Sequence, residues 1–166
     1  MKQDVAIAMR YLIVNNMDDY KYIKMAYKEA LKAYKENEVP VGCVIVKDGI
    51  VIAKTHNKRE QKCSALAHAE ILAIKEACKK TGTKFLDGTT IYITLEPCLM
   101  CMGAIIQARI SRIVYSANEP KFGSIVSIGN ILNDYKLNHH IEVTQGIMED
   151  EVSELMKSFF SELRKK

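Results

Sequence analysis

A chain of 166 residues with 48% apolar and 27% charged residues has the composition of an ordinary globular protein, and it is long enough for one domain with a sizeable core. No apolar run approaches a membrane span, and the apolar segment 5–14 contains Arg10 and lacks a clear cleavage site, which argues against a signal peptide. The net charge of +4 permits a polyanionic partner without requiring one. Five cysteines, an odd number, favour reduced thiols in the cytoplasm over a disulfide framework.

The apolar pattern alternates between helical and strand-like segments. Residues 1–17 fit neither pattern and form an N-terminal extension of unassigned structure, and the clear pattern starts behind Asp18 and Asp19, which are suitable helix caps. Residues 125–132 are ambiguous between helix and irregular structure. The other expected elements are a helix over 18–37, strands over 44–46 and 50–55, a helix over 68–80, a strand over 91–95, a helix over 98–108, strands over 113–115 and 141–144, and a helix over 150–166.

This order of elements predicts an α/β protein with a mixed five-stranded sheet and helices on both faces, in a three-layer α/β/α arrangement. The turn Lys47-Asp48-Gly49 makes the first two strands a hairpin. Because the chain has no internal repeat, low-complexity tract or linker, residues 18–166 are expected to form a single domain. The helix over 68–80 is expected to bury the apolar side chains Ile71, Leu72, Ile74 and Ala77.

The stretch Ile-Tyr-Ile-Thr-Leu-Glu-Pro-Cys-Leu-Met-Cys, residues 91–101, runs from a buried strand into a helix. Pro97 suits the first turn of a helix because its φ is fixed and it has no N–H. Cys98 and Cys101 would then lie one turn apart on the same face, at the positive end of the helix dipole. Thiols in that position have lowered pKa values and can serve as metal ligands. Two cysteines, however, make only half of a metal site.

His68 is the candidate for a third ligand, because it opens the helix over 68–80 as Cys98 opens the next one. In α/β sheets ligands gather where strands end and helices begin, so the two helix starts can converge. Three protein ligands leave the fourth position of one Zn²⁺ open for water, as in catalytic sites. Glu70 is the expected catalytic carboxylate, since zinc lowers the pKa of a bound water to about 7 and a neighbouring carboxylate can take its proton.

Each part of this pattern also has a less specific interpretation. A lone C-x-x-C pair occurs in structural metal sites and redox pairs, and a lone histidine at a helix start is usually a packed or capping residue. Cys63 lies close enough to His68 to compete as a ligand, whereas Cys43 and Cys78 are expected to be small core residues. The combination of His-x-Glu with Pro-Cys-x-x-Cys after a strand is far more specific, because it is the signature of zinc-dependent nucleobase deaminases.

Over residues 18–166 the chain resembles the bacterial tRNA-specific adenosine deaminases, which have the cytidine-deaminase-like fold. The matching segments are Glu38-Val39-Pro40-Val41-Gly42, His56-Asn57, Ala67-His68-Ala69-Glu70, Thr94 to Cys101, Arg109 to Tyr115, Asn138-His139, and Phe159-Phe160 near a basic C-terminus. The resemblance implies a cytoplasmic, zinc-dependent homodimer with one zinc ion per subunit. It also implies hydrolytic deamination of adenosine to inosine at the wobble position, with the tRNA anticodon stem-loop as partner.

The resemblance implies roles for individual residues as well. His68, Cys98 and Cys101 would hold zinc, and Glu70 would move protons. Asn57 would hydrogen-bond the purine, and Glu119, in the loop after the fourth strand, would contact the target ribose. Further candidates are Lys121 and Arg164 as phosphate contacts, Phe160 as support for a stacked base, and Ala69 and Asn138 as substrate-binding residues.

The loop that begins at Glu119 departs from the family pattern. The family sequence Asp-Pro-Lys-x-Gly, followed by small residues, is here Glu-Pro-Lys-Phe-Gly followed by Ser-Ile-Val, with a longer acidic residue and bulkier neighbours. Two alternatives therefore stay open. One is a deaminase of a free base or nucleoside, such as guanine or cytosine, on the same fold. The other is a catalytically silent RNA-binding or structural-zinc module.

Overall fold

The computed structural model describes residues 2–134 and 136–165, with side chains described from residue 17 on. No helix in this part of the chain is both long and apolar enough to cross a membrane. The elements are α1 (Lys2–Lys35), β1 (Gly42–Lys47), β2 (Ile50–His56), α2 (Ala69–Thr81), β3 (Thr89–Leu95), α3 (Leu99–Gln107), β4 (Arg112–Ala117), α4 (Ile131–Asp134), β5 (Glu142–Gln145) and α5 (Glu149–Leu163).

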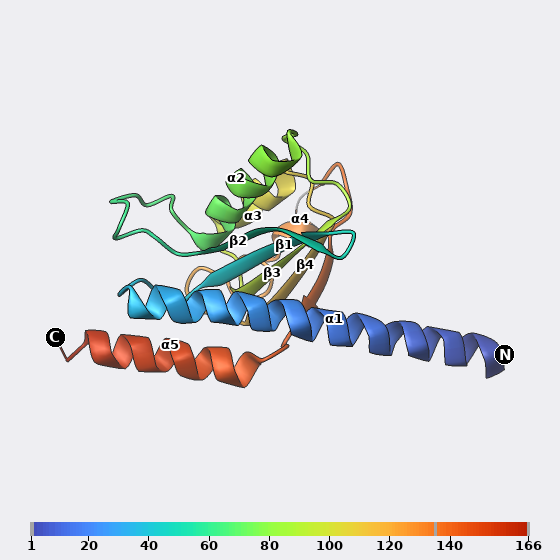
Figure 1. The fold of residues 1–166 in the computed structure, drawn as a ribbon, viewed down its shortest axis with the longest axis horizontal. Coiled ribbons are helices and arrows are strands. Elements are labelled where there is room, and N and C mark those ends of the chain that lie inside the picture. The colour runs from blue at the N-terminus through green and yellow to red at the C-terminus, as the bar shows by residue number, and fades with distance from the viewer. Residues whose placement is uncertain (1, 135, 166) are drawn as a thin grey trace.

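The strands form one five-stranded sheet in the order β2-β1-β3-β4-β5. Strand β1 pairs antiparallel with β2 and with β3, whereas β3, β4 and β5 run parallel. Helices α2 and α3 cover one face of the sheet, and α1 and α5 lie on the other (Figure 1). The expected mixed sheet between two helical layers is therefore confirmed.

Both faces of the sheet are buried because the central strands carry apolar side chains on both sides. Alternate residues such as Ile91 and Ile93 belong to the core beneath α2 and α3, whereas Tyr92 between them belongs to the core beneath α1. Helix α1 approaches so closely that a Cβ on Gly42 would lie 1.9 Å from the carbonyl oxygen of Ala26. Any larger residue at position 42 would push α1 away from the sheet.

Helix α1 passes straight through Asp18 and Asp19, so their interpretation as helix caps is wrong. Asp19 is buried, and its carboxylate accepts hydrogen bonds from both terminal nitrogens of Arg112 at 2.7 Å and from the Tyr92 hydroxyl at 3.1 Å. These contacts tie α1 to β3 and β4. Asp19, which the sequence suggests as a helix cap, instead forms a bidentate ion pair with Arg112 of the sheet.

The buried side of α2 differs from the expected one. Its buried apolar residues are Ala69, Ala73 and Ala77, at a spacing of four, whereas Ile71, Leu72 and Ile74 are only partly buried. Small side chains let the helix lie close to the sheet, and the larger apolar residues are left on its flanks. The prediction was therefore correct for Ala77 alone.

The ambiguous segment 125–132 is mostly irregular. Regular helix begins only at Ile131 and lasts for the four residues of α4. The preceding turns take their shape from the carboxylate of Glu96, as described below.

Candidate active site

The starts of α2 and α3 bring the predicted metal ligands together. His68 and Cys98 are the N-cap residues of these helices, each in an extended backbone conformation, and Cys101 lies in the first turn of α3. The Nδ1 atom of His68 lies 3.6 Å from the Cys101 Sγ and 3.8 Å from the Cys98 Sγ. The three ligand atoms all lie within 4.8 Å of one another. The expected convergence of the two helix starts is thus present.

These distances fit a tetrahedral zinc ion. Bonds of about 2.0–2.1 Å to nitrogen and about 2.3 Å to sulfur, at a tetrahedral angle, separate the two ligand atoms by about 3.6 Å. One imidazole and two sulfurs are also the donor types that zinc prefers. Cys63 is exposed and hydrogen-bonds to the Glu60 carbonyl instead, so it stays outside this group.

The two cysteines have opposite electrostatic environments. The Cys101 thiol donates to the Cys98 sulfur, which, together with His68, lowers the pKa of Cys98 to about 4 in spite of its burial. The same hydrogen bond, together with burial, raises the pKa of Cys101. The expectation of lowered pKa values is therefore correct for Cys98 and wrong for Cys101. The hydrogen bond that the His68 ring donates to the Cys98 sulfur is the main cause of the raised pKa of His68.

Glu70 lies in the first turn of α2 beside these ligands. Its residue is only 4% exposed, and its carboxyl group contacts the Cys101 side chain. Burial raises the pKa of Glu70, an effect only partly opposed by hydrogen bonding to its own backbone and by the charge of His68. A buried carboxyl of this kind can hold a proton at a pH where an exposed carboxyl has lost it.

A cavity of about 310 Å³ opens over these residues. Apolar side chains and several polar and charged groups form its wall, a combination that small-molecule sites use to bind and orient a ligand. The lining residues are Val39, Val41, Asn57, Arg59, His68, Glu70, Leu95, Glu96, Cys98, Glu119 and Phe122.

Asn57 is buried in the wall of this cavity. Its Oδ1 accepts the backbone N–H of Ala69 at 2.8 Å, which fixes the first residue of α2. The oxygen is therefore committed to the helix, and the amide nitrogen is the end of Asn57 that can donate to a ligand. Ala69 itself is fully buried, and its backbone N–H holds the Asn57 side chain in place.

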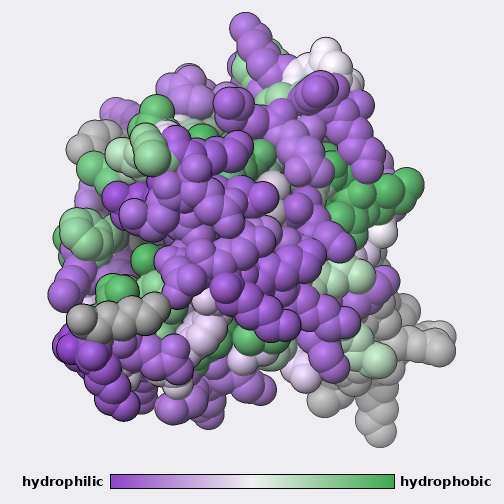
Figure 2. Space-filling view, turned by 60° about the vertical axis from the view of Figure 1, so that its left-hand side comes forward, coloured by the Kyte–Doolittle hydropathy of each residue, from purple (hydrophilic) through white to green (hydrophobic). Residues whose placement is uncertain are grey.

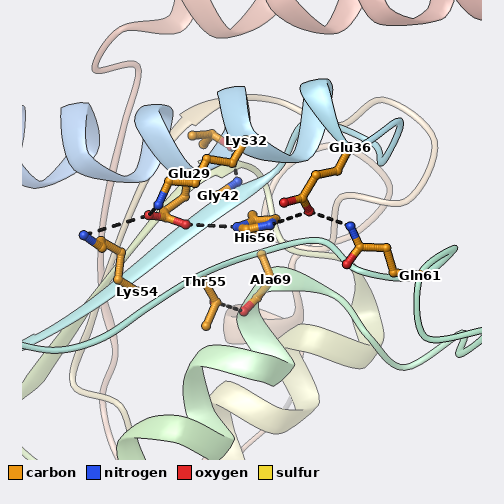
Figure 3. A network of polar contacts seen from close by, with 10 residues as sticks. Glu29, Lys32, Glu36, Gly42, Lys54, Thr55, His56, Gln61 and Ala69 are labelled. Atoms are coloured by element: carbon orange, nitrogen blue, oxygen red, sulfur yellow. Dashed lines mark hydrogen bonds and ion pairs between the residues drawn. The ribbon is translucent and has the colours of Figure 1, made fainter.

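A buried charged network holds the residue before Asn57. Both ring nitrogens of His56 lie 2.9 Å from carboxylates, Nδ1 from Glu29 of α1 and Nε2 from Glu36 in the turn that follows α1 (Figure 3). Because carboxylates only accept, both bonds form when the ring is doubly protonated. Glu29 also accepts from Lys32 at 2.7 Å. The network ties the end of β2, and with it Asn57, to α1.

Glu96 shapes the loop on the other side of the cavity. Its Oε1 accepts the backbone N–H groups of Ile125, Val126 and Ser127 at 2.8–3.1 Å. Its Oε2 accepts the Glu119 N–H at 3.0 Å and the Ser127 hydroxyl. Although burial alone raises the pKa of Glu96, these donors outweigh it and hold the pKa below the ordinary value.

Gly123 completes this arrangement. A Cβ at this position would lie 2.2 Å from the Glu96 Oε2 and 2.6 Å from the Glu119 carbonyl oxygen. Gly123 also pairs with Cys98 in an isolated bridge, and the next residue, Ser124, donates to the Pro97 carbonyl at 3.0 Å. Loop 119–127 is thus fixed directly against the segment that carries the cysteine ligands.

The structure gathers some of the predicted substrate contacts around the cavity but not all of them. Asn57 and Glu119 line it, and Lys121 lies two residues beyond Glu119 on the exposed part of the loop. Asn138 lines two other surface hollows instead. Phe160 and Arg164 lie at the end of α5 and are exposed, with the Phe160 ring packed edge-on to Phe159.

Six residues of the cavity wall were not predicted from the sequence as site residues: the apolar Val39, Val41 and Leu95, and also Arg59, Glu96 and Phe122. Glu96 lay inside the recognised motif, but its role depends on partners about thirty residues further along the chain. Arg59 lies in the polar loop before His68, and Phe122 occupies the variable position of the loop motif. Both reach the cavity only through the folding of their loops.

Comparison with known proteins agrees with this geometry. Residues 17–164 match the MafB19-like deaminase family. The chain belongs to this family. It is 47% identical over 148 residues to the tRNA-specific adenosine deaminase of Bacillus subtilis, covering 89% of this chain and 92% of that protein. The predicted resemblance is confirmed.

Solved structures of deaminases show the same fold. A structure from work on A-to-I editing by tRNA:A34 deaminases at the wobble position of transfer RNA is 39% identical, with a TM-score of 0.78 over 81% of this chain and 98% of that chain. The guanine deaminase of Bacillus subtilis is also 39% identical, but with a TM-score of 0.57 over 59% of this chain and 63% of that one. The MafB19-like deaminase therefore shares its architecture with enzymes of more than one substrate class.

Proposed function

We propose that this deaminase converts adenosine to inosine at the wobble position of a tRNA anticodon. The observation that carries the proposal is the group formed by His68, Cys98 and Cys101, of which His68 and Cys98 line one cavity together with Glu70. The extent of the match to tRNA-specific adenosine deaminases, nearly full length on both sides, favours RNA over a free base.

His68, Cys98 and Cys101 are the residues that would hold one zinc ion in each subunit. Bound zinc supplies a Lewis acid that makes water a nucleophile near neutral pH. Glu70 takes the two protons of the attacking water in turn and delivers one to N1 of the adenine and the other to the departing 6-amino group, which leaves as ammonia. Asn57 donates to the purine and fixes its orientation, and Glu119 contacts the ribose at the cavity wall.

The anticodon loop suits this cavity because its bases are already unpaired, so extrusion of the target adenine requires little energy. Lys121 and Arg164 serve as phosphate contacts, with Phe160 and Asn138 at the outer margin of the bound RNA. The face shown in Figure 2 is mostly hydrophilic, with its apolar side chains in separate smaller groups, which suits a polar partner such as RNA.

The active form is a homodimer that works in the cytoplasm. Several large apolar side chains close in sequence to the site are more than half exposed, and a second subunit would cover them: Leu66, Leu99 and Ile128. Five cysteines without a disulfide among them support a reducing compartment. Sedimentation of the purified protein tests the dimer directly.

Three substrates distinguish this proposal from its alternatives. The zinc-loaded protein is incubated with an anticodon stem-loop that carries adenosine at the wobble position, with free guanine, and with free cytosine. Glu70→Gln is the control for contaminating activity. Inosine in the stem-loop supports the proposal. Ammonia from a free base alone would instead assign a nucleobase deaminase, and binding without any product would indicate a silent RNA-binding module.

A further inference from the structure

The fixed loop 119–127 presents an aromatic ring at the mouth of the cavity. Phe122 lines the cavity, yet 65% of the residue is exposed. Among the described residues, the other large apolar side chains with comparable exposure do not line this cavity. The Phe122 ring forms part of the cavity wall but is still exposed to water. An exposed apolar group of this kind, at the place where substrate enters, can bind a ligand.

The backbone on both sides of Phe122 is held in place. The Gly123 N–H donates to the Glu119 carbonyl at 2.8 Å, and the Lys121 N–H donates to the Glu119 carboxylate at 2.9 Å. Glu119 and residues 125–127 are in turn bound to the buried carboxylate of Glu96. The ring is therefore carried by a preorganised turn, and a ligand that contacts it need not order the loop first.

The groups around Phe122 are mostly polar, with Glu70, Glu96 and Glu119 also in the cavity wall, and the placement of the cations beside the ring favours a nucleic acid over an apolar partner. Arg59 lines the same cavity, and the exposed Lys121 is the neighbour of Phe122 in the chain. An aromatic face beside cationic side chains is the usual arrangement for single-stranded nucleic acid, in which bases stack on rings and phosphates meet Lys or Arg. Phe160 fits this role less well, because it is 38% exposed and does not line the cavity.

We infer that Phe122 is a stacking platform for a nucleobase adjacent to the target adenosine. This inference rests on the proposed function. When the adenine leaves its stack to enter the cavity, the neighbouring base loses a stacking partner on one side. The Phe122 ring takes that place at the cavity mouth. The ring thereby stabilises the RNA conformation in which the adenosine is extruded. It also favours substrates whose flanking nucleotide carries a base over substrates in which that nucleotide is abasic.

The test is a double-mutant cycle between the ring and the base. Wild type and Phe122→Ala are assayed for kcat/KM of inosine formation on the intact stem-loop and on two stem-loops with an abasic nucleotide immediately 5′ or 3′ of the target. The expected loss for Phe122→Ala on the intact substrate is roughly 5- to 150-fold, the range for one base–aromatic stack. On one of the abasic substrates the two proteins should differ by no more than about twofold.

Matched variants separate stacking from other roles. Phe122→Leu keeps the apolar volume and should behave like alanine, whereas Phe122→Tyr keeps the ring and should behave like wild type. Ile50→Ala, which removes an equally exposed side chain (65%) from the β1–β2 hairpin, should have no effect. Zinc content and melting temperature are measured for each variant.

Three activity results would overturn the inference. They are an unchanged kcat/KM for Phe122→Ala, an equal loss on all three substrates, and activity of Phe122→Leu like that of wild type. A shift of Phe122→Ala from dimer to monomer would make the ring a subunit contact instead, which also contradicts stacking. If the wild type makes no inosine on the intact stem-loop, the proposed function itself fails, independently of Phe122.

Discussion

The buried carboxylate of Glu29 gives the sharpest stability prediction, for Glu29→Gln. The Glu29 side chain is 4% exposed and accepts from His56 at 2.9 Å and from Lys32 at 2.7 Å, with Lys54 at 3.9 Å. The amide keeps the shape of the side chain but removes its charge, and its NH₂ group must face one of these donors. Breaking a buried ion pair from one side costs about 3–5 kcal/mol. Because the amide oxygen still accepts one hydrogen bond, we expect about 3 kcal/mol.

This loss is measurable as a melting temperature. For a chain of this size 1 kcal/mol corresponds to about 2–4 °C, so Glu29→Gln should lower Tm by about 6–12 °C at pH 7. Glu36→Gln is the matched control, because it makes the same change at the other nitrogen of the same imidazole. The Glu36 side chain is 36% exposed and screened by water, so the expected decrease in Tm is much smaller.

The pKa shift of Glu29 determines how the stability loss in Glu29→Gln should change with pH. Burial alone would raise the pKa of Glu29, but Lys32 and His56 outweigh it and hold that pKa below the ordinary value of 4.5. A lowered pKa contributes stability above the ordinary value, and this contribution is lost as the pH falls through the folded-state value. The Tm difference between wild type and Glu29→Gln should therefore be full at pH 6–7 and shrink below about pH 4.5. A decrease of less than about 3 °C at pH 7, or a difference that grows in acid, would refute the reasoning.

Three further predictions concern the site. Glu70→Gln should keep its zinc and lose roughly 10²- to 10⁴-fold in kcat, and native-rate ammonia release by this variant would remove Glu70 from proton transfer. Cys98→Ser should lose zinc on dialysis, because two remaining ligands hold the ion poorly, and stoichiometric zinc by atomic absorption would indicate another ligand set. Gly123→Ala should destabilise the chain by about 1–3 kcal/mol in urea titration, because its Cβ would lie 2.2 Å from Glu96. An unchanged midpoint would show that loop 119–127 can shift freely.

The metal cluster could be predicted from sequence because each of its parts is local. His68 and Cys98 each stand immediately before a helix, and Cys101 follows Cys98 by one turn. Helical periodicity and the proline before Cys98 place them at helix starts without knowledge of the rest of the fold. The remaining step, that the two starts meet, follows from the general location of sites in α/β sheets.

The supporting contacts could not be predicted, because their partners are distant in the chain. Asp19 and Arg112 are 93 residues apart, and periodicity carries no information about such pairs. Glu96 likewise acts on a loop about thirty residues later, where its carboxylate takes the place that helix carbonyls would occupy. Because these hydrogen bonds replace those of a helix, segment 125–132 forms turns, although its sequence is also compatible with a helix.

Three buried carboxylates, Glu70 and Glu96 in the cavity wall and Glu29 in the network with His56, have environments that shift their pKa values in different directions. Glu29 and Glu96 receive enough donors to outweigh their burial, so their pKa values are lowered and they remain fixed anions that shape the cavity. At Glu70 burial prevails over the hydrogen bond to its own backbone and the charge of His68, so its pKa is raised. Proton transfer requires a group that gains and loses its proton near the working pH, whereas a structural anion must not. As the pH falls, Glu70 therefore takes up its proton before Glu29 and Glu96 do, which is the order that the proposed proton carrier requires in a site shaped by fixed anions.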